Sequence, residues 1–582
     1  MRSFISRRNR TLRGTCNVCR HHLQSRSGIS PSSHSPSLPA RPCLCPLTAP
    51  PSLRCNKSEK WSITSAPSPT LREEYNRAMS RLPLHIIRPT LLCSALLCGA
   101  GAAHAATYYI SSSGSDTNSG LRKNDAWKTL DQVNRHVFAP GDRILFHRGD
   151  AWSGQLTPQG SGAEGHPVIL DTYGSGPEPI IHGPGTDHSS AVDLKDLSYW
   201  EIHHLELTNS QPAGGTHVLR GILVESSSQK NLEHHIYIRD CYVHDVNSVG
   251  YGDPHYTKIS GGILYDVNID DARVENCHVA RVTVEGIRNN SPLTTSRVIF
   301  RNNEIEDVYG DGIVLHGSSG GSIIEHNRVR NACMSDAANY AAVWTYASRH
   351  TLIQFNEVYG TTAGGPNDGE AFDADIDTDG DIFQYNYTHD NARGFMLFMS
   401  SAKNIVVRYN ISQNDAMMAA RQGGHRLFYQ DGKTGSLSNR IYNNTFYTGS
   451  LDTVFFQSRN IDFRNNILYS TGEVKQLSTL PVNADSQIER NLFFPAITPA
   501  KSDQESIAGH NLAADPRFRA GGAGKANAHS GKAGFFRDPK EYRLKRGSPA
   551  LRAGQVIEQN GGFDYFGKSL PAQQAPNLGA AN

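Results

Sequence analysis

The feature that most restricts the fold of this chain is a short phrase that recurs along residues 236–495. It consists of a polar residue, Asn, any residue and usually an apolar residue, as in Asn302-Asn303-Glu304-Ile305. The second place of successive copies is taken by Cys241, Cys277, Asn303, Asn327, Asn356, Asn386, Asn410, Asn444, Asn466 and Asn491. These positions lie 36, 26, 24, 29, 30, 24, 34, 22 and 25 residues apart. The fold must therefore be built from a repeated unit.

The shorter spacings, about 22–25 residues, match one turn of a parallel β-helix with insertions in some turns. An alternating strand begins each copy, as at 297–302, and a second one follows, as at 312–316. The alternative, a β-propeller, repeats every 40–50 residues or so and does not fit. Asn amides stacked about 4.8 Å apart can bond one another, and Asn tolerates the left-handed conformation expected at a corner. The sequence predicts an all-β fold, a parallel β-helix solenoid.

The ends of the repeat predict the remaining organisation. Residues 106–185 hold a strand at 107–111 and a helical stretch at 126–136, which we expect to cap the open end of the solenoid. The β-helix is expected over 106–495, and residues 496–582 are expected to be an irregular C-terminal cover packed on it. Cys241 and Cys277 should stack as buried apolar residues, with a disulfide between them as the less favoured alternative.

The start of the chain predicts export. Residues 1–78 hold 13 Lys+Arg and 3 Asp+Glu, and Met79 begins a secretory pattern. Basic Arg81 and Arg88 precede an apolar run over 90–103, and Ala103-His104-Ala105 resembles a cleavage site. We interpret 79–105 as a signal peptide and 1–78 as upstream sequence or a disordered or transit-type extension. The protein is expected to be secreted or periplasmic.

The charge balance limits the classes of molecule that the protein can bind. Residues 106–582 hold 42 Lys+Arg and 52 Asp+Glu, a net charge of −10. This argues against nucleic acid as the partner, while local basic groups still allow an acidic glycan. The apolar run is too short for a comfortable membrane span, and no later segment is apolar enough to replace it. We expect no membrane span and a monomer.

Two terminal segments resemble a known family. Residues 108–120 with Trp127-Lys128-Thr129-Leu130, and residues 511–518 with 547–550, resemble the start and tail of exported right-handed parallel β-helix proteins of the pectate-lyase-like superfamily. The resemblance covers about 107–580. It implies the right-handed fold and a carbohydrate-active type of protein that binds a polysaccharide in a groove along one sheet. The superfamily includes lyases, hydrolases, epimerases and adhesin modules, so it leaves the reaction open.

The expected groove gathers ionisable and aromatic residues. We align the second strand of each turn on its small residue: Gly262, Gly286, Gly312, Ala342, Ala371 and Gly394. Residues expected to bind substrate, the aromatic ones by stacking on sugar rings, are Lys258, His316, Trp344 and Tyr346. Candidate catalytic residues are Arg288, Asp311, Glu370, Asp373, Asp375, His389 and Arg393. In this alignment, Met396 of the next turn takes the position equivalent to Asp373, and Phe398 takes the position equivalent to Asp375. The alternative is an ordinary solvated sheet face.

An acidic run lies within this set. Asp373, Asp375, Asp377 and Asp379 alternate, so a strand would place all four on one face, where their charges repel. One hypothesis is calcium bound by Asp373, Asp375 and Asp377, although Asn386 stands where a calcium loop has Glu. A second is a pair of carboxyl groups acting on a glycosidic bond. A third, for residues 377–381, is a solvated turn.

Three functions remain open. On superfamily grounds we favour a lyase that cleaves a uronate-containing glycan by β-elimination, with Arg288 or Arg393 binding the uronate carboxylate or acting as the base. Only Lys258 and Lys403 occur between residues 230 and 432, and this scarcity of the other usual base favours a hydrolase. The hydrolase would use two of Asp311, Glu370, Asp373 and Asp375. The third possibility is a non-catalytic glycan-binding surface protein.

Overall fold

The computed structural model describes residues 105–211, 217–247, 258–335, 340–362, 365–430, 438–458, 460–482, 486–497, 510–522, 539–570 and 572–582. The expected extension 1–78 and the expected signal peptide, apart from residue 105, lie outside these ranges. Within them, no helix is both long enough and apolar enough to cross a membrane.

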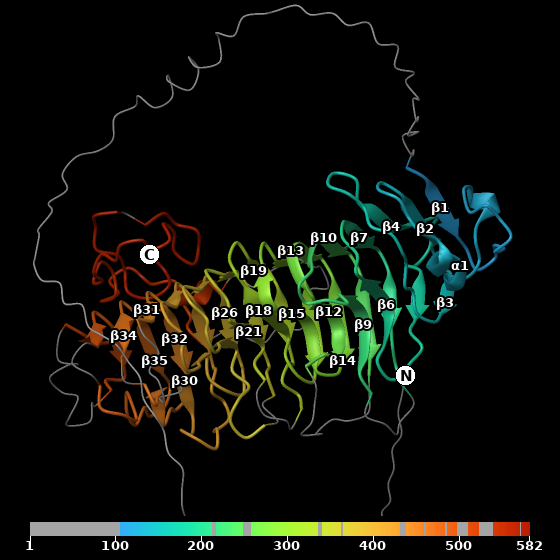
Figure 1. Cartoon of the computed structure of the whole chain (residues 1–582). Coiled ribbons are helices and arrows are strands. Elements are labelled where there is room, and N and C mark those ends of the chain that lie inside the picture. The colour runs from blue at the N-terminus through green and yellow to red at the C-terminus, as the bar shows by residue number, and fades with distance from the viewer. Residues whose placement is uncertain are drawn as a thin grey trace, which may run out of the picture. The chain divides into compact units, whose positions relative to one another are not determined.

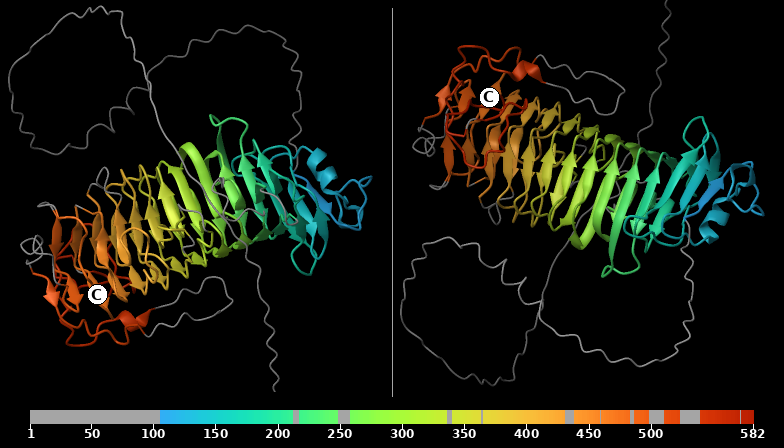
Figure 2. Two further views of the ribbon diagram at one scale, coloured as in Figure 1. Left: turned by 90° about the horizontal axis from the view of Figure 1, so that it is seen from below. Right: turned by 90° about the horizontal axis from the view of Figure 1, so that it is seen from above.

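Three parallel sheets run side by side along the chain (Figures 1 and 2). The first sheet contains, in spatial order, β1 (Thr107–Ile110), β2 (Arg143–His147), β4 (Val168–Tyr173), β7 (Trp200–His203), β10 (Leu232–Arg239), β13 (Asn268–Glu275), β16 (Ile299–Arg301), β19 (Ile323–Glu325), β22 (Leu352–Gln354), β25 (Ile382–Gln384), β28 (Val406–Arg408), β31 (Arg440–Tyr442), β34 (Asp462–Arg464) and β36 (Gln487–Glu489). The second contains β3 (Ala151–Ser153), β5 (Ile180–His182), β8 (Glu206–Thr208), β11 (Tyr242–Val246), β14 (His278–Val282), β17 (Glu304–Val308), β20 (Arg328–Arg330), β23 (Glu357–Tyr359), β26 (Tyr387–His389), β29 (Ile411–Gln413), β32 (Thr445–Thr448), β35 (Ile467–Ser470), β37 (Leu492–Phe494) and β38 (Leu512–Ala513). The third contains β6 (Ser189–Lys195), β9 (Leu219–Glu225), β12 (Gly261–Asp266), β15 (Glu285–Thr295), β18 (Ile313–Ser318), β21 (Val343–Tyr346), β24 (Phe372–Ala374), β27 (Met396–Phe398), β30 (Arg426–Gln430) and β33 (Thr453–Phe456).

Strands from successive turns pair in parallel register, which confirms the predicted solenoid. In the first sheet Ile353 pairs with Phe383, which pairs with Val407 one turn later. All three side chains are buried, whereas Leu352 and Gln354 beside Ile353 are half-buried. The inward residues of all turns join one hydrophobic core along the solenoid. The period-2 alternation in the sequence thus becomes an inside and an outside.

The recurrent Asn residues form the expected ladder. Oδ1 of Asn386 accepts hydrogen bonds from the backbone N–H and from Nδ2 of Asn356, each at 3.0 Å. Its own Nδ2 donates to the carbonyl oxygen of Ile353 at 3.0 Å. The left-handed conformation falls on the residue before each Asn, such as Tyr385 with φ 56°, and not on the Asn itself. The left-handed residue turns the chain, so the following side chain points along the stack.

Cysteine occupies the ladder position in the two turns that precede Asn303. Cys241 and Cys277 are buried and both are free thiols, as expected for small buried residues, and the disulfide alternative is wrong for this structure. The backbone N–H of Cys277 donates to Oδ1 of Asn303 at 2.9 Å, so the Asn ladder begins directly beneath it.

The N-terminal cap is shorter than predicted. It holds the short 3-10 helix η1 (Lys123–Asp125) and the helix α1 (Leu130–Arg135). Oγ1 of Thr129 accepts the N–H of Gln132 and caps α1, which places the helix start after residue 126. Leu130 and Val133 of α1 are buried in the main core, so the helix covers the first turns (Figure 1).

The C-terminal boundary lies later than the expected residue 495. Strand β38 pairs with β37, and Asn511 continues the ladder because its Oδ1 accepts the backbone N–H of Asn491 at 2.8 Å. The sequence analysis had placed this Asn in the tail. The cover beyond it includes the short 3-10 helix η2 (Lys540–Tyr542), and the Tyr542 hydroxyl donates to Oε1 of Gln413 at 2.7 Å.

Candidate functional site

The predicted alignment of four turns of the third sheet is confirmed by the strand register. Arg288 pairs with Val314, Val314 with Trp344, and Trp344 with Asp373. The small residues on which the turns were aligned are required for a steric reason. A Cβ on Gly286, for example, would lie 2.4 Å from the carbonyl oxygen of Gly312. The four side chains of the row are nevertheless buried, so the alternative of a solvated sheet face is wrong.

The alignment fails in the next turn. Asp373 pairs with Leu397, and Met396 pairs with Phe372 one place earlier. Met396 and Phe398 both belong to the main core. The apolar contacts of the core set the register here, and the small residue Gly394 does not.

Next to this row lies a row of acidic residues, Glu285, Asp311 and Glu370, each just before or at the start of its strand. Oδ2 of the fully buried Asp311 lies 2.8 Å from Nζ of Lys258, and Oδ1 accepts the N–H of Ala341 at 2.9 Å. Burial acts to lower the pKa of Lys258, but the charges of Asp311 and Glu285 outweigh it and raise that pKa. Lys258 therefore stays a cation and does not suit the role of a base.

A second cation lies beside the same row. Nη1 of Arg288 lies 3.5 Å from Oε1 of Glu285, and both side chains are buried. Burial, followed by the charge of Asp311, raises the pKa of Glu285. Nζ of Lys258 and Cζ of Arg288 lie 4.5 and 5.3 Å from the Trp344 ring centre. Trp344 is only 5% exposed, so its ring binds the protein's own cations and the expected stacking on sugar is wrong.

Three carboxyl groups gather at β24. Asp373 is buried, and burial together with the charge of Asp375 raises its pKa well above the ordinary value. Asp375 is half-buried, and burial raises its pKa against the opposing charge of Lys258. The sequence analysis missed Asp368, a half-buried residue whose charge raises the pKa of Glu370, Asp373 and Asp375. Asp368 precedes the strand and therefore had no place in a strand alignment.

His316 and Tyr346 lie opposite each other in the neighbouring row. Nδ1 of His316 lies 3.0 Å from Oδ1 of Asn290, and its ring meets that of Tyr346 edge-on at 4.4 Å. Burial, with a smaller effect of Arg288, lowers the pKa of His316 to about 4, so this imidazole is neutral near pH 7. Both rings are half-buried and so stay available as expected substrate-binding groups.

Two candidate catalytic residues lie elsewhere. His389 belongs to β26 in the second sheet, where Nε2 lies 3.3 Å from Oε1 of Glu357 and Nδ1 lies 2.9 Å from Oδ2 of Asp390. The expectation that it reaches the groove is wrong because its strand belongs to a different sheet. Arg393 is buried, and its guanidinium donates to backbone carbonyls of residues 365, 418 and 419. The guanidinium thus joins these loops through its hydrogen bonds and is not available to bind a substrate beside the acidic cluster.

The acidic run does not form one face. β24 ends at Ala374, and Asp377 is exposed with φ 60° and accepts the Ser401 hydroxyl at 2.8 Å. Among the described residues, one group of three His, Cys, Asp or Glu side chains has its possible metal-ligand atoms within 4.8 Å of one another. That group lies on the first sheet and includes none of these aspartates. Asp373, Asp375 and Asp377 therefore do not fit the expected calcium site. The solvated-turn hypothesis for residues 377–381 agrees with the exposed Asp377 but is wrong for Thr378 and Asp381, which are fully buried.

The segment 365–370, which carries Asp368, is held from the following turns. Arg426 of β30, missed by the sequence analysis, places Nη2 3.0 Å from Oε1 of Glu370 and 3.0 Å from the carbonyl oxygen of Asn367. Further hydrogen bonds to this segment come from the Arg393 guanidinium, the Arg421 N–H and the Thr361 hydroxyl. The segment is thus fixed in relation to β24.

Comparison with known proteins agrees with this architecture. The family described as "Right handed beta helix region" matches residues 215–358. The chain is a right-handed parallel β-helix. It is 26% identical over 600 residues to a lacto-N-biosidase of Bifidobacterium longum subsp. longum, covering 81% of this chain and 36% of that protein. The chain thus spans little more than a third of the length of that relative.

Two solved structures illustrate the likeness. A GH136 lacto-N-biosidase from Eubacterium ramulus matches with 23% identity and a TM-score of 0.48 over 59% of this chain and 64% of that one. The pectate lyase Pel9A matches with 14% identity and a TM-score of 0.41 over 82% of this chain and 97% of that one. Both are carbohydrate-active enzymes, one a glycosidase and one a lyase.

Proposed function

We propose that the chain is a carbohydrate-active enzyme, a glycoside hydrolase whose acidic pair is Asp368 and Asp375. The observation that carries the proposal is their accessibility, because both are half-buried within a cluster of carboxyl groups. Catalytic carboxyl groups must touch the substrate. The other acidic members of the cluster are buried: Glu285, Asp311, Glu370 and Asp373.

The pair offers the two roles that glycoside hydrolysis needs. One carboxyl group protonates the leaving oxygen and the other acts as nucleophile or base. Burial and the nearby charge of Asp368 raise the pKa of Asp375, which suits Asp375 as the proton donor. Asp368 would then act as the nucleophile or base. Asp373 is buried, and burial together with the charge of Asp375 raises its pKa, which favours its neutral form.

The site favours a neutral glycan. A lyase needs a cation that can reach the uronate carboxyl group, but Lys258 is paired with Asp311 and Arg288 is buried. A hydrolase therefore fits this site better than the lyase expected on superfamily grounds. The likeness to a lacto-N-biosidase supports a lacto-N-bioside as the first substrate to test.

The experiment incubates the full chain with para-nitrophenyl lacto-N-bioside and with a panel of neutral and uronate glycans. New reducing ends and unsaturated-uronate absorbance are followed in parallel. We expect reducing ends without that absorbance, and a kcat loss of about 100-fold or more in Asp375→Asn and Asp368→Asn. Asp377→Asn, on the exposed turn, is the matched control and should keep wild-type activity. Unsaturated products would establish a lyase instead, and binding without turnover would establish a glycan-binding protein.

We further propose that the protein is exported. The support is the secretory pattern of residues 79–105. Expression from Met79 in a bacterial host, followed by mass spectrometry of the periplasmic and extracellular protein, should give an N-terminus at Ala106. A cytoplasmic product that retains residue 79 would contradict the proposal.

A further inference from the structure

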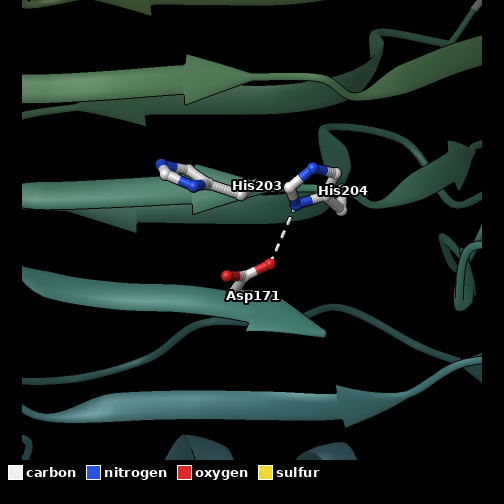
Figure 3. A group of neighbouring side chains, drawn as sticks. All are labelled: Asp171, His203 and His204. Atoms are coloured by element: carbon white, nitrogen blue, oxygen red, sulfur yellow. Dashed lines mark hydrogen bonds and ion pairs between the residues drawn. The ribbon is translucent and has the colours of Figure 1, made fainter. Parts of the chain in front are cut away.

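Two histidines and an aspartate meet on the outside of the first sheet, away from the acidic cluster on the third (Figure 3). Leu170 pairs with Ile202 across β4 and β7, so the next residues, Asp171 and His203, are neighbours facing outward. His204 follows with φ 56°, which interrupts the alternation of the strand. Nδ1 of His204 consequently lies 2.9 Å from Oδ1 of Asp171.

We propose that Asp171, His203 and His204 bind a divalent transition-metal ion of the zinc type. One ligand atom from each residue lies within 4.8 Å of the other two. Two ligands at about 2.1 Å from a tetrahedral zinc ion are about 3.4 Å apart, so a small closure of these side chains suffices. Imidazole and carboxylate are ligands that zinc prefers, and all three residues are half-buried, which leaves a fourth position for water.

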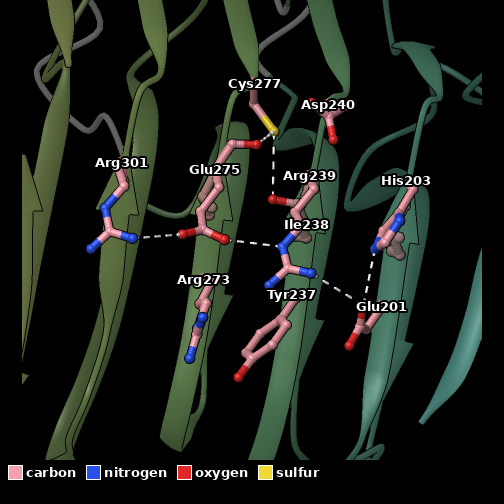
Figure 4. Close-up of polar contacts among 12 residues, drawn as sticks. Glu201, His203, Tyr237, Ile238, Arg239, Asp240, Arg273, Glu275, Cys277 and Arg301 are labelled. Atoms are coloured by element: carbon pink, nitrogen blue, oxygen red, sulfur yellow. Dashed lines mark hydrogen bonds and ion pairs between the residues drawn. The ribbon is translucent and has the colours of Figure 1, made fainter. Parts of the chain in front are cut away.

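The surrounding residues support this role. Nε2 of His203 lies 3.1 Å from Oε2 of Glu201, an arrangement that fixes the ring and leaves Nδ1 for a metal. Glu201 is itself held by Nη1 of Arg239 at 3.4 Å (Figure 4). Nη2 of Arg143 lies 3.3 Å from Oδ2 of Asp171, which orients Oδ1 toward His204. His203 and Asp171 are thus each positioned by a neighbour that would remain in place after the metal binds.

The metal would join two successive turns near the N-terminal end. Asp171 lies on β4, His203 is the last residue of β7, and His204 follows it. An ion that binds the folded chain and not the unfolded one raises the melting temperature with its concentration. The site lies on the first sheet and β24 belongs to the third, so an ion bound here would take no part in the proposed glycan cleavage.

The test is calorimetric titration of zinc chloride into the full chain, after chelator treatment and with the thiols reduced. Wild type should bind one more zinc ion than His204→Gln or Asp171→Asn, and only wild type should gain thermal stability from that ion. The cysteines of the chain are present in every variant, so the difference isolates this site. His234→Gln, which alters a half-exposed histidine on the adjacent strand β10, is the matched control and should bind like wild type.

Far-UV circular dichroism establishes that each variant is folded, and His203→Gln supplies a further variant if either of the others is not. Equal zinc stoichiometry and equal thermal shifts in wild type and the folded ligand variants would overturn the proposal.

Discussion

Nη2 of Arg426 lies 3.0 Å from Oε1 of Glu370, and each side chain is only 1% exposed. Such a pair is favourable only while both partners are present, because each charge has lost its water. The same guanidinium nitrogen donates to the carbonyl oxygen of Asn367 at 3.0 Å. The pair therefore anchors the segment that carries Asp368 to β30, and Arg426 is a positioning residue for the proposed site.

Replacing Arg426 by Met should destabilise the protein strongly. The change leaves Glu370 buried without its cation, and breaking one side of a buried pair costs about 3–5 kcal/mol. Urea denaturation measures the loss in the free energy of unfolding. The double variant Arg426→Met with Glu370→Gln should recover much of it, because no buried charge is left. A single variant as stable as wild type would show that the pair is not needed.

Replacing Asn386 by Ala should break the ladder. The change removes the partner of the backbone N–H and of one Nδ2 hydrogen of Asn356, and the Nδ2 donor to the carbonyl oxygen of Ile353. Each buried unsatisfied group costs about 1–3 kcal/mol, so we expect a loss of at least about 3 kcal/mol in chemical denaturation. Asn231→Ala, at an exposed position where Nδ2 donates to Oγ of Ser226, is the control and should change stability by less than about 0.5 kcal/mol.

Asp381 should make stability fall with rising pH. This carboxyl group is fully buried, and burial raises its pKa from 3.8 to about 7. Between these two values the folded chain holds a proton that the unfolded chain has lost, so the free energy of unfolding decreases as the pH rises. Thermal melts from pH 4 to 8 should show this decline in wild type and less of it in Asp381→Asn. Asp377→Asn should follow wild type, and identical slopes in all three proteins would refute the prediction.

The charge of Lys258 should affect how kcat/KM depends on pH. Its charge lowers the pKa of Asp375 against the effect of burial, so Lys258→Met should raise that pKa further. If Asp375 donates the proton, the basic limb of kcat/KM moves to higher pH, whereas Lys258→Arg keeps the wild-type profile. Lys403→Met removes a cation that pairs with Asp379 on the exposed turn and should leave the limb in place. An unchanged limb in Lys258→Met would exclude Asp375 as the proton donor.

Much of the third sheet could be predicted from the sequence. The alignment on Gly286, Gly312, Ala342 and Ala371 succeeded, and at the two glycines a Cβ would meet a backbone carbonyl oxygen of the next turn. It failed at Gly394, where the core contacts of Met396 set the register. Asp368 and Arg426 were missed because neither belongs to the aligned positions, although both lie close to β24 in space.

The sequence by itself determined the solenoid. The same Asn recurs once per turn, and stacking the turns is the arrangement that lets each amide bond the next. Only the tertiary structure decided which acidic residues are accessible and how their pKa values shift. Those properties depend on burial and on charges contributed by other turns, as Lys258 affects Asp375, and no local pattern in the sequence encodes them.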